Sequence, residues 1–434
     1  MPTYSMSALA ADLEARIRAT RLIDFDVPWA DELVFPAFDG LSIRNVPHSI
    51  GQFLGQAMPA PLDAALWDGE APDVDRVVLF ISDGLGYLWL SQLLEEDAEL
   101  AELTSRLTDG RGPLPLTSIA PSTTSVALPT IWTGATPAQH GMIGLTLHLR
   151  QASTTANMLY FRPQQGNAPY GALEEWGIKP EQVMSELTIS QRLLNGGVPT
   201  HLVIQRGLVG TGLSRIIHRK VRQHYEHGEF SDLWLRAEDA LRETVGQRAY
   251  LHIYWHGVDR LSHGYGAHNR YVHNEIKQQF RALVNLLDQP ELQDGRTLFM
   301  LIADHGHYDV PNAIKLHEGK VNQPILDAMQ MHITSDPRLG YLHLHPDLRD
   351  AAIAVIDEHY REQLAWVDAK TALNAGLFGP EPHHPEVKYR LGDVLLLARR
   401  SWQVNDWVMA FPTPSLHGGL DEWEMLVPLL WRVI

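Results

Sequence analysis

Apolar and β-branched residues form short continuous runs, and longer stretches with apolar residues at helical spacing lie between them. The runs predict buried strands at residues 74–82, 201–205, 249–255 and 297–303. The intervening stretches predict helices at residues 87–107, 180–194, 233–245 and 272–287. Strands that alternate with helices are typical of a mostly parallel sheet covered on both faces, so we expect an α/β three-layer sandwich.

The pattern changes after about residue 330, where shorter elements follow one another. We expect a strand at residues 341–345, a helix at 346–366 and a strand at 393–398. Residues 424–431 form one more apolar run, which we expect to return to the central sheet. These expectations divide the chain into a core, residues 1–330 plus 410–434, and a small inserted α+β subdomain, residues 331–409.

Composition narrows the chemistry of the 434-residue chain. The absence of cysteine excludes disulfides, thiolate metal sites and a cysteine nucleophile, so any metal must be held by oxygen and imidazole nitrogen. The net charge of −17 argues against a nucleic-acid polymer as partner. No apolar run approaches the roughly 20 residues of a membrane span, and the charged N-terminus is not typical of a signal peptide. We therefore expect a cytoplasmic protein; the pattern indicates no oligomeric state.

Carboxylates follow three of the predicted strands. Asp83 precedes Gly84, Asp259 stands four residues before His263, and Asp304 directly precedes His305. The carboxyl ends of parallel strands are where open α/β sheets bind ligands. Taken singly, Asp83 would equally suit a helix N-cap, and Asp259 with His263 a surface pair. A charge directly after a buried strand is costly unless it is paired or bound to a metal, which favours a metal site.

Two further motifs complete the set. A hydroxyl cluster at residues 122–125 precedes an apolar stretch, so it is expected at a helix N-terminus, where phosphate and a developing alkoxide are favoured. His417 precedes two glycines, which suggests a loop that reaches into a site. Together the residues form two candidate sites, one with Asp259, His263 and His417, the other with Asp83, Asp304 and His305. Two divalent cations about 4 Å apart can activate one oxygen nucleophile, and this donor set favours zinc, with manganese second.

These motifs, in their order along the chain, resemble those of the alkaline phosphatase superfamily, and most closely its type I phosphodiesterase and nucleotide pyrophosphatase branch. Residues 121–134 and 137–141 are similar to the nucleophile motif of that branch, whose nucleophile falls on Thr124. The metal motifs match at Asp83-Gly84, Asp259, His263, Asp304-His305-Gly306 and His417. The matching positions span residues 83–417, which is most of the chain.

The resemblance implies an alkaline phosphatase-like fold and a metal-dependent hydrolase of small phosphate esters, of phosphodiesterase or nucleotide pyrophosphatase type. It implies that Thr124 is both the nucleophile and a metal ligand, and that a covalent phospho-threonine forms and is then hydrolysed. It implies two divalent cations per chain.

One departure concerns substrate binding. The branch carries an Asn shortly after its His-Gly pair, which helps to hold a phosphate oxygen, whereas this chain has Gly144-Leu145-Thr146. Thr146 and His148 are therefore the candidates for that contact. Three aromatic residues lie in the region where a nucleobase slot of the branch would fall, namely Tyr160, Phe161 and Tyr170, and the alternative role for aromatic residues there is packing.

Other activities remain open at this point. Phosphomonoesterase, phosphonate hydrolase and phosphomutase belong to the same superfamily, and Ser122 or Ser125 would suit the serine nucleophile of a mutase. A sulfatase is excluded because neither a cysteine nor a serine stands in the required Cys/Ser-x-Pro-x-Arg context. From a different class, PglZ-type proteins of phage-defence systems share the metal motifs, which allows a binding component with little catalysis. The remaining hypothesis is an α/β protein whose carboxylates are helix caps.

Overall fold

A seven-stranded sheet forms the core of the computed structural model, which describes residues 6–67, 69, 71–406 and 413–434. In spatial order the strands are β2 (Leu114–Thr117), β18 (Leu426–Val433), β9 (Thr297–Ile302), β1 (Arg76–Ser82), β8 (Ala249–Trp255), β6 (Thr200–Gln205) and β7 (Gln223–His227). β18 is antiparallel to both of its neighbours, and the other pairs are parallel. The predicted mostly parallel α/β sheet is confirmed.

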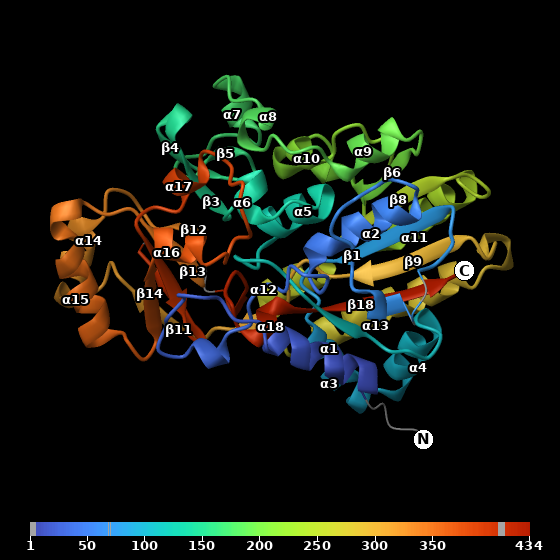
Figure 1. Cartoon of the computed structure of the whole chain (residues 1–434), viewed down its shortest axis with the longest axis horizontal. Helices are drawn as coiled ribbons and strands as arrows, with labels where there is room; N and C mark the ends of the chain where they lie inside the picture. Colours follow the sequence, from blue (N-terminus) through green and yellow to red (C-terminus); the bar gives the residue numbers. More distant parts are fainter. Residues whose placement is uncertain (1–5, 68, 70, 407–412) are drawn as a thin grey trace.

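Helices cover both faces of this sheet (Figure 1). Figure 1 shows one group below the sheet, α1 (Ala8–Arg18), α3 (Tyr87–Glu96), α4 (Ala98–Leu107) and α13 (Arg270–Leu287). The group above it contains α2 (Val46–Phe53), α5 (Thr124–Thr133), α9 (Ile189–Asn195) and α10 (Gly212–Ile217). α11 (Phe230–Glu243) packs on β6 and β7. Because the strands are buried on both faces, β1 and β9 consist of almost continuous apolar residues.

Two predicted helices are interrupted. The helix expected at residues 87–107 is broken at Asp97, whose backbone is extended and whose side chain accepts hydrogen bonds from the N–H groups of Glu99 and Leu100. Asp97 therefore caps α4 instead of continuing α3. The helix expected at residues 180–194 is likewise divided into α8 (Pro180–Val183) and α9, with Thr188 as the N-cap of α9.

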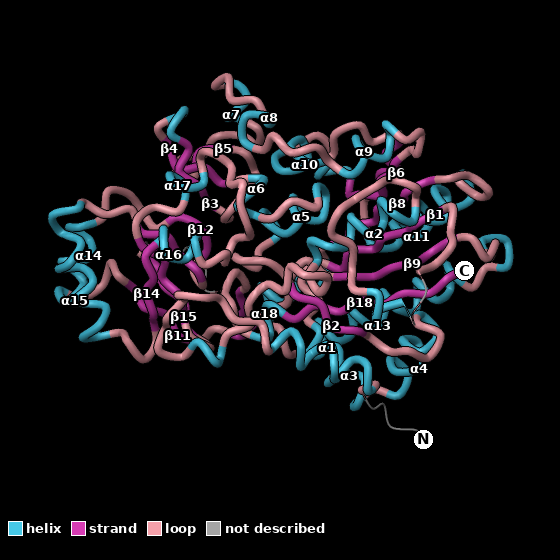
Figure 2. Tube along the Cα trace, viewed as in Figure 1, coloured by secondary structure: helices cyan, strands magenta, loops and turns pink. Residues whose placement is uncertain are grey.

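A smaller antiparallel sheet lies at the other end of the molecule (Figure 1). Its order is β12 (Thr334–Asp336), β13 (Leu339–Leu342), β15 (Val394–Ala398) and β14 (Leu364–Asp368), with α14 (Gln323–Ala328) and α15 (Arg349–His359) beside it. The segments between the two sheets are mostly loops (Figure 2). The proposed subdomain 331–409 contains all four strands, and its boundary near residue 409 lies outside the described residues.

The helix expected through residue 366 was wrong at its end. α15 ends at His359, and Leu364 begins β14, which pairs with β15 along its whole length. A short apolar run does not distinguish helix from strand by its own periodicity. Here, pairing with β15 makes residues 364–368 a strand.

The N-terminal segment packs on the core. α1 buries Ala10, Leu13 and Ile17 and contacts β2, while α2 contacts α5. Among the described residues, the structure contains no helix with the length and apolar character needed to cross a bilayer.

One buried ion pair joins the smaller sheet to the core. Arg338, which follows β12, donates from Nε and Nη2 to the two carboxylate oxygens of Glu424, at 3.1 and 2.7 Å. Both side chains are completely buried. Removing one partner of such a pair leaves an uncompensated buried charge.

We expect Glu424→Ala to lower the free energy of unfolding by about 3–5 kcal/mol, measured by urea denaturation. The control is Arg349→Ala, because Arg349 pairs with the half-exposed Asp368 and surface pairs contribute about 0–1 kcal/mol. Equal losses in the two variants would contradict the expectation.

Candidate active site

Three neighbouring strands end at the same level of the sheet. β1 runs parallel to β8 and β9, and Ser82 stands opposite Trp255. Asp83 follows β1, Asp304 lies just beyond β9, and β8 leads into α12 (Gly257–Tyr265). The strand ends therefore bring together the carboxylates that are far apart in the sequence.

Gly84 permits the close approach between these segments. Its φ is +80°, and a Cβ there would lie 2.8 Å from Cα of Asp259 and 2.9 Å from Cδ2 of His307. Any larger residue would meet both backbone strain and a steric clash. Glycine at this position therefore lets the end of β1 contact α12.

The first cluster contains one carboxylate and three imidazoles, Asp259, His263, His307 and His417. Oδ1 of Asp259 lies 3.2 Å from Nε2 of His263, 2.9 Å from that of His307 and 3.5 Å from that of His417. The sequence predicted three of the four and missed His307. The available signal was its position one residue after Gly306, where the chain turns His307 back toward Asp259 while His305 faces the other cluster.

The second cluster contains Asp83, Asp304 and His305, as predicted. Nε2 of His305 lies 3.5 Å from Oδ1 of Asp83 and 3.4 Å from Oδ2 of Asp304. Both of these carboxylate oxygens are buried and have no hydrogen-bond partner in the part of the chain that the structure describes. Buried charged oxygens without partners are costly, so this donor set fits a bound cation.

The two clusters adjoin, since the rings of His305 and His417 stack with their centroids 3.7 Å apart. In all four imidazoles Nδ1 lies within 3.0–3.1 Å of an oxygen of Gly306, Ser415 or Ser122. When Nδ1–H donates to such an oxygen, Nε2 keeps a free lone pair that points into the cluster. Both donor sets, nitrogen and oxygen without sulfur, suit divalent cations such as zinc.

Burial and like-charged neighbours shift the pKa values of residues in these clusters in the same direction. Burial, together with the carboxylates of Asp304 and Asp259, raises the pKa of Asp83 well above its usual value. Burial, together with the surrounding imidazoles of His305 and His307, lowers the pKa of His417 well below its usual value. His417 is therefore neutral, which is the form that binds a metal.

Thr124 is the hydroxyl that the fold brings to these clusters. It begins α5, and its Oγ1 lies 3.0 Å from Nε2 of His305. The neighbouring serines are placed differently: Ser122 donates to the carbonyl oxygen of Gly419 at 2.8 Å, and Oγ of Ser125 is buried without a partner among the described residues. Thr124 therefore combines a helix N-terminus with proximity to both clusters.

The two predicted substrate contacts lie in different surroundings. Thr146 lines a cavity of about 380 Å³ beside the clusters, and its hydroxyl donates to the carbonyl oxygen of Ser335 at 3.2 Å. His148 is absent from the described lining of that cavity, and its ring lies against His343 with 5.8 Å between centroids. Of the pair, only Thr146 faces the site.

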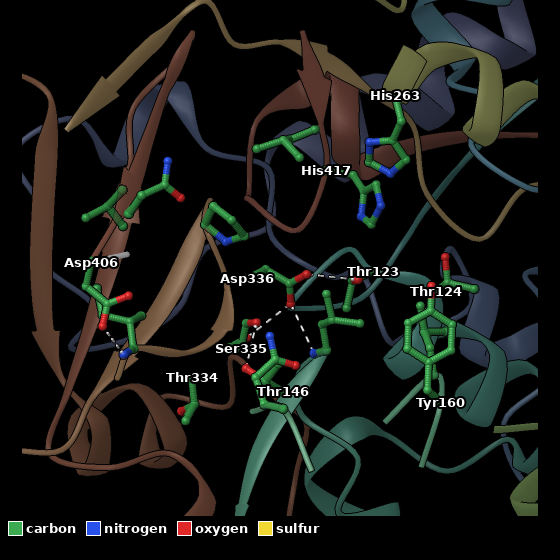
Figure 3. A pocket seen from close by; sticks show the side chains of 18 of the residues that line it. Thr123, Thr124, Thr146, Tyr160, His263, Thr334, Ser335, Asp336, Asp406 and His417 are labelled. Atoms are coloured by element: carbon green, nitrogen blue, oxygen red, sulfur yellow. Dashed lines mark hydrogen bonds between the residues drawn. The ribbon is translucent and has the colours of Figure 1, made fainter. Parts of the chain in front are cut away.

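Asp336, which sequence reasoning missed, contacts the segment where the branch carries its Asn. Its Oδ2 accepts from the backbone N–H of Leu145 at 3.2 Å, and its Oδ1 accepts from the hydroxyl of Thr123 at 3.1 Å (Figure 3). Burial raises its pKa to about 6. It belongs to β12 of the smaller sheet, and no motif near it in the sequence indicated this contact.

The three aromatic candidates for ligand binding also lie in different surroundings. Tyr160 lines the 380 Å³ cavity, and its ring stacks on Tyr170 with centroids 4.5 Å apart. Phe161 is fully buried in the core. Tyr160 and Tyr170 can therefore meet a ligand, whereas Phe161 has a packing role.

His140, within the motif that resembles the nucleophile region, is held as a neutral residue. Its Nδ1 accepts from the N–H of Met142 and its Nε2 lies 3.0 Å from the hydroxyl of Thr130. Burial, with the nearby His384 and Arg390, lowers its pKa to about 3. His140 therefore supports the structure instead of transferring protons.

This histidine should make the fold sensitive to acid. Between pH 6.5 and about 3 the unfolded chain protonates His140 and the folded chain does not, so the free energy of unfolding falls as the pH falls. One such group contributes a slope of about 1.4 kcal/mol per pH unit. In urea unfolding at pH 7, 6 and 5, His140→Gln should show a shallower decline than the wild type; parallel curves would contradict this.

Fold and site together define the class of this protein. A mostly parallel sheet carries two clusters of metal-type residues at its carboxyl edge, beside a hydroxyl at a helix N-terminus. The chain belongs to the type I phosphodiesterase / nucleotide pyrophosphatase family, whose model matches residues 77–407. The resemblance predicted from the motifs is thereby confirmed, and it places the chain among hydrolases of phosphate esters.

Solved structures show the same fold at low sequence identity. Murine ectonucleotide pyrophosphatase/phosphodiesterase 5 is 13% identical with a TM-score of 0.59, and the match covers 81% of this chain and 87% of that chain. Phosphonoacetate hydrolase from Sinorhizobium meliloti, solved with phosphonoformate, is 17% identical with a TM-score of 0.60 and coverages of 82% and 90%. An inactive variant of the murine protein was solved in complex with AMP. A search of curated protein sequences gave no match.

Proposed function

We propose that the protein is a two-metal phosphodiesterase that acts through Thr124. The observation that carries this proposal is the contact of the Thr124 hydroxyl with His305, at the junction of two clusters whose histidines stack at 3.7 Å. The ligands would be Asp259, His263, His307 and His417 for one cation, and Asp83, Asp304 and His305 for the other, with Thr124 between them. The donor chemistry favours zinc, with manganese second.

The reaction would proceed in two displacements. Two bound divalent cations would supply Lewis-acid stabilisation of the attacking and leaving oxygens. Oγ1 of Thr124, after giving its proton to solvent, forms a bond to phosphorus as the bond to the first ester oxygen breaks, and that alcohol leaves with a proton from solvent. Water then attacks phosphorus, the bond to Oγ1 breaks, and the phosphate monoester leaves as Thr124 regains its proton. The N-terminus of α5 favours the negative charge that develops on Thr124.

The surroundings support this assignment of roles. The serine loop before Thr124 holds the His417 loop, because Oγ of Ser122 accepts from the N–H of Gly418 at 3.2 Å and Nδ1 of His417 lies 3.1 Å from the carbonyl oxygen of Ser122. The nucleophile segment and a cluster ligand are thus directly connected. Such fixed geometry is what phosphoryl transfer requires.

The test is hydrolysis of bis-p-nitrophenyl phosphate by purified protein after dialysis, with and without added zinc or manganese. Metal-dependent release of p-nitrophenol, together with about two bound cations per chain, is the expected result. Tight metal binding without turnover of any phosphate ester would contradict the proposal and favour a binding component with little catalysis.

A further inference from the structure

Two cavities meet at Thr124. The first, of about 380 Å³, and the second, of about 240 Å³, share four lining residues, Thr124, Leu159, Tyr160 and Asp259. A phosphodiester carries two substituents on one phosphorus atom. With phosphorus at Thr124, each cavity can receive one substituent.

The second cavity is apolar and neutral. Apart from Asp83 and Asp259 of the clusters, its described lining consists of apolar, aromatic, hydroxyl and imidazole side chains, with no Lys or Arg. Trp132 packs against both His218 and His252 there, with ring centroids 4.8 and 4.5 Å away. Burial lowers the pKa of His252 to about 3, so its imidazole is uncharged at neutral pH. This cavity suits an apolar or planar substituent.

The first cavity is acidic. Beyond Asp259, its described lining contains two carboxylates, Asp336 and Asp406, and again no Lys or Arg. In Figure 3, Asp336 lies between Thr124 at one end of the cavity and Asp406 at the other. Arg162 lies over the ring of Tyr160, at 5.0 Å from its centroid, and is not part of the described lining. Negative charge therefore covers the path from the clusters into this cavity.

Asp336 forms no ion pair with a Lys or Arg among the described residues. Its carboxylate accepts hydrogen bonds from the hydroxyls of Thr123 and Ser335 and from the N–H of Leu145, all of them neutral donors. Only 3% of the residue is exposed. Asp406, by contrast, lies 2.9 Å from Nδ1 of His332. A buried carboxylate that faces a cavity without a charged partner is costly unless the cavity's occupant supplies the positive charge.

Building on the proposed function, we propose that the substrate is a phosphodiester with a single negative charge, whose substituent in the first cavity carries an amine cation that meets Asp336. The apolar second cavity receives the other substituent. While Thr124 is protonated, two divalent cations against three cluster carboxylates leave about one positive charge, which one phosphodiester anion balances. Further phosphate or carboxylate groups would meet an acidic or an apolar wall. Pyrophosphates, phosphate monoesters and carboxylated phosphonates are therefore poor substrates.

The experiment compares esters that share one leaving group. The metal-loaded enzyme is assayed at pH 8 with p-nitrophenyl phosphocholine, p-nitrophenyl ethyl phosphate and p-nitrophenyl phosphate, and separately with ATP by release of AMP and pyrophosphate. We expect kcat/KM for the cationic diester to exceed that of the ethyl diester about tenfold, which is about 1.4 kcal/mol, and that of the monoester and ATP by more. Equal values, or ATP as the best substrate, would overturn the inference. Turnover of no ester at all would instead reject the proposed function.

Two variants separate charge from structure. Asp336→Asn should remove the preference of the enzyme for the cationic diester over the ethyl diester, whereas a merely structural role would lower both rates equally and keep their ratio. Asp406→Asn is the matched control, and the ratio should change less because His332 already pairs with that carboxylate. Calorimetric binding of both diesters to metal-loaded Thr124→Ala gives a second readout without turnover. A ratio unchanged in Asp336→Asn would contradict the role of Asp336.

Discussion

Thr124→Ala should lose phosphodiesterase turnover by on the order of 10⁴-fold or more in kcat. The reason is positional: Thr124 is the hydroxyl that begins α5 and lies 3.0 Å from Nε2 of His305. Ser122 already donates to Gly419, and Ser125 lines neither cavity, so neither serine can replace it. The measurement is single-turnover release of p-nitrophenol from bis-p-nitrophenyl phosphate with zinc present.

Two controls accompany this variant. Thr124→Ser keeps a hydroxyl at the same position and should retain far more activity, while Ser125→Ala should remain close to the wild type. Metal content should change little in Thr124→Ala, because the seven carboxylate and imidazole ligands remain. Substantial turnover by Thr124→Ala would contradict the role of Thr124 as the nucleophile and favour a serine nucleophile instead.

Removal of metal should abolish activity and destabilise the fold. Asp83 and Asp304 each have a buried carboxylate oxygen without a hydrogen-bond partner among the described residues. The repulsion between these two carboxylates is therefore uncompensated once a cation is withdrawn. A ligand present at about 1,000 times its dissociation constant stabilises the native state by about 4 kcal/mol. Two such cations contribute about 8 kcal/mol, so for a chain of this size we expect chelation to lower Tm by about 9 °C in calorimetry.

Adding metal back and changing one proposed ligand test whether the effect of the chelator is due to loss of the bound cations. Zinc, and less effectively manganese, should restore both Tm and turnover after the chelator is removed. Asp304→Asn should lower the metal content toward one cation per chain, whereas Asp309→Asn, outside both clusters, should bind metal normally. A metal-free protein whose Tm is insensitive to chelator would support the hypothesis that these carboxylates are only helix caps.

The sequence predicted the sheet and the ends of its central strands well, for a physical reason. β1, β8 and β9 are buried on both faces, so their apolar runs are nearly continuous, and any polar residue that follows marks the strand end. In a parallel sheet these ends meet at one edge, which is why the strand pattern alone could bring Asp83, Asp259 and Asp304 together. The hydroxyl cluster at residues 122–125 was predicted from its position ahead of an apolar stretch, and the resemblance to the nucleophile motif of the family singled out Thr124 within it.

The local sequence pattern gave wrong or incomplete predictions where the conformation depends on contacts with distant segments. The break at Asp97 depends on whether its side chain caps α4 or faces solvent, and the strand at Leu364 depends on pairing with β15. The four-residue spacing of Asp259 and His263 was readable, but the return of His307 to Asp259 depends on how the chain turns after Gly306.

By itself, then, the sequence determined the α/β class, the family and six of the seven residues that the structure gathers in the two clusters, because these depend on residue types at strand ends and on local order. Only the tertiary structure decided the rest. It placed His307 in the first cluster and Asp336 beside Thr123, and it left His148 outside the described lining of the cavity. Asp336 comes from a separate sheet, 213 residues beyond Thr123, and no local pattern encodes a contact that depends on how two sheets pack against each other.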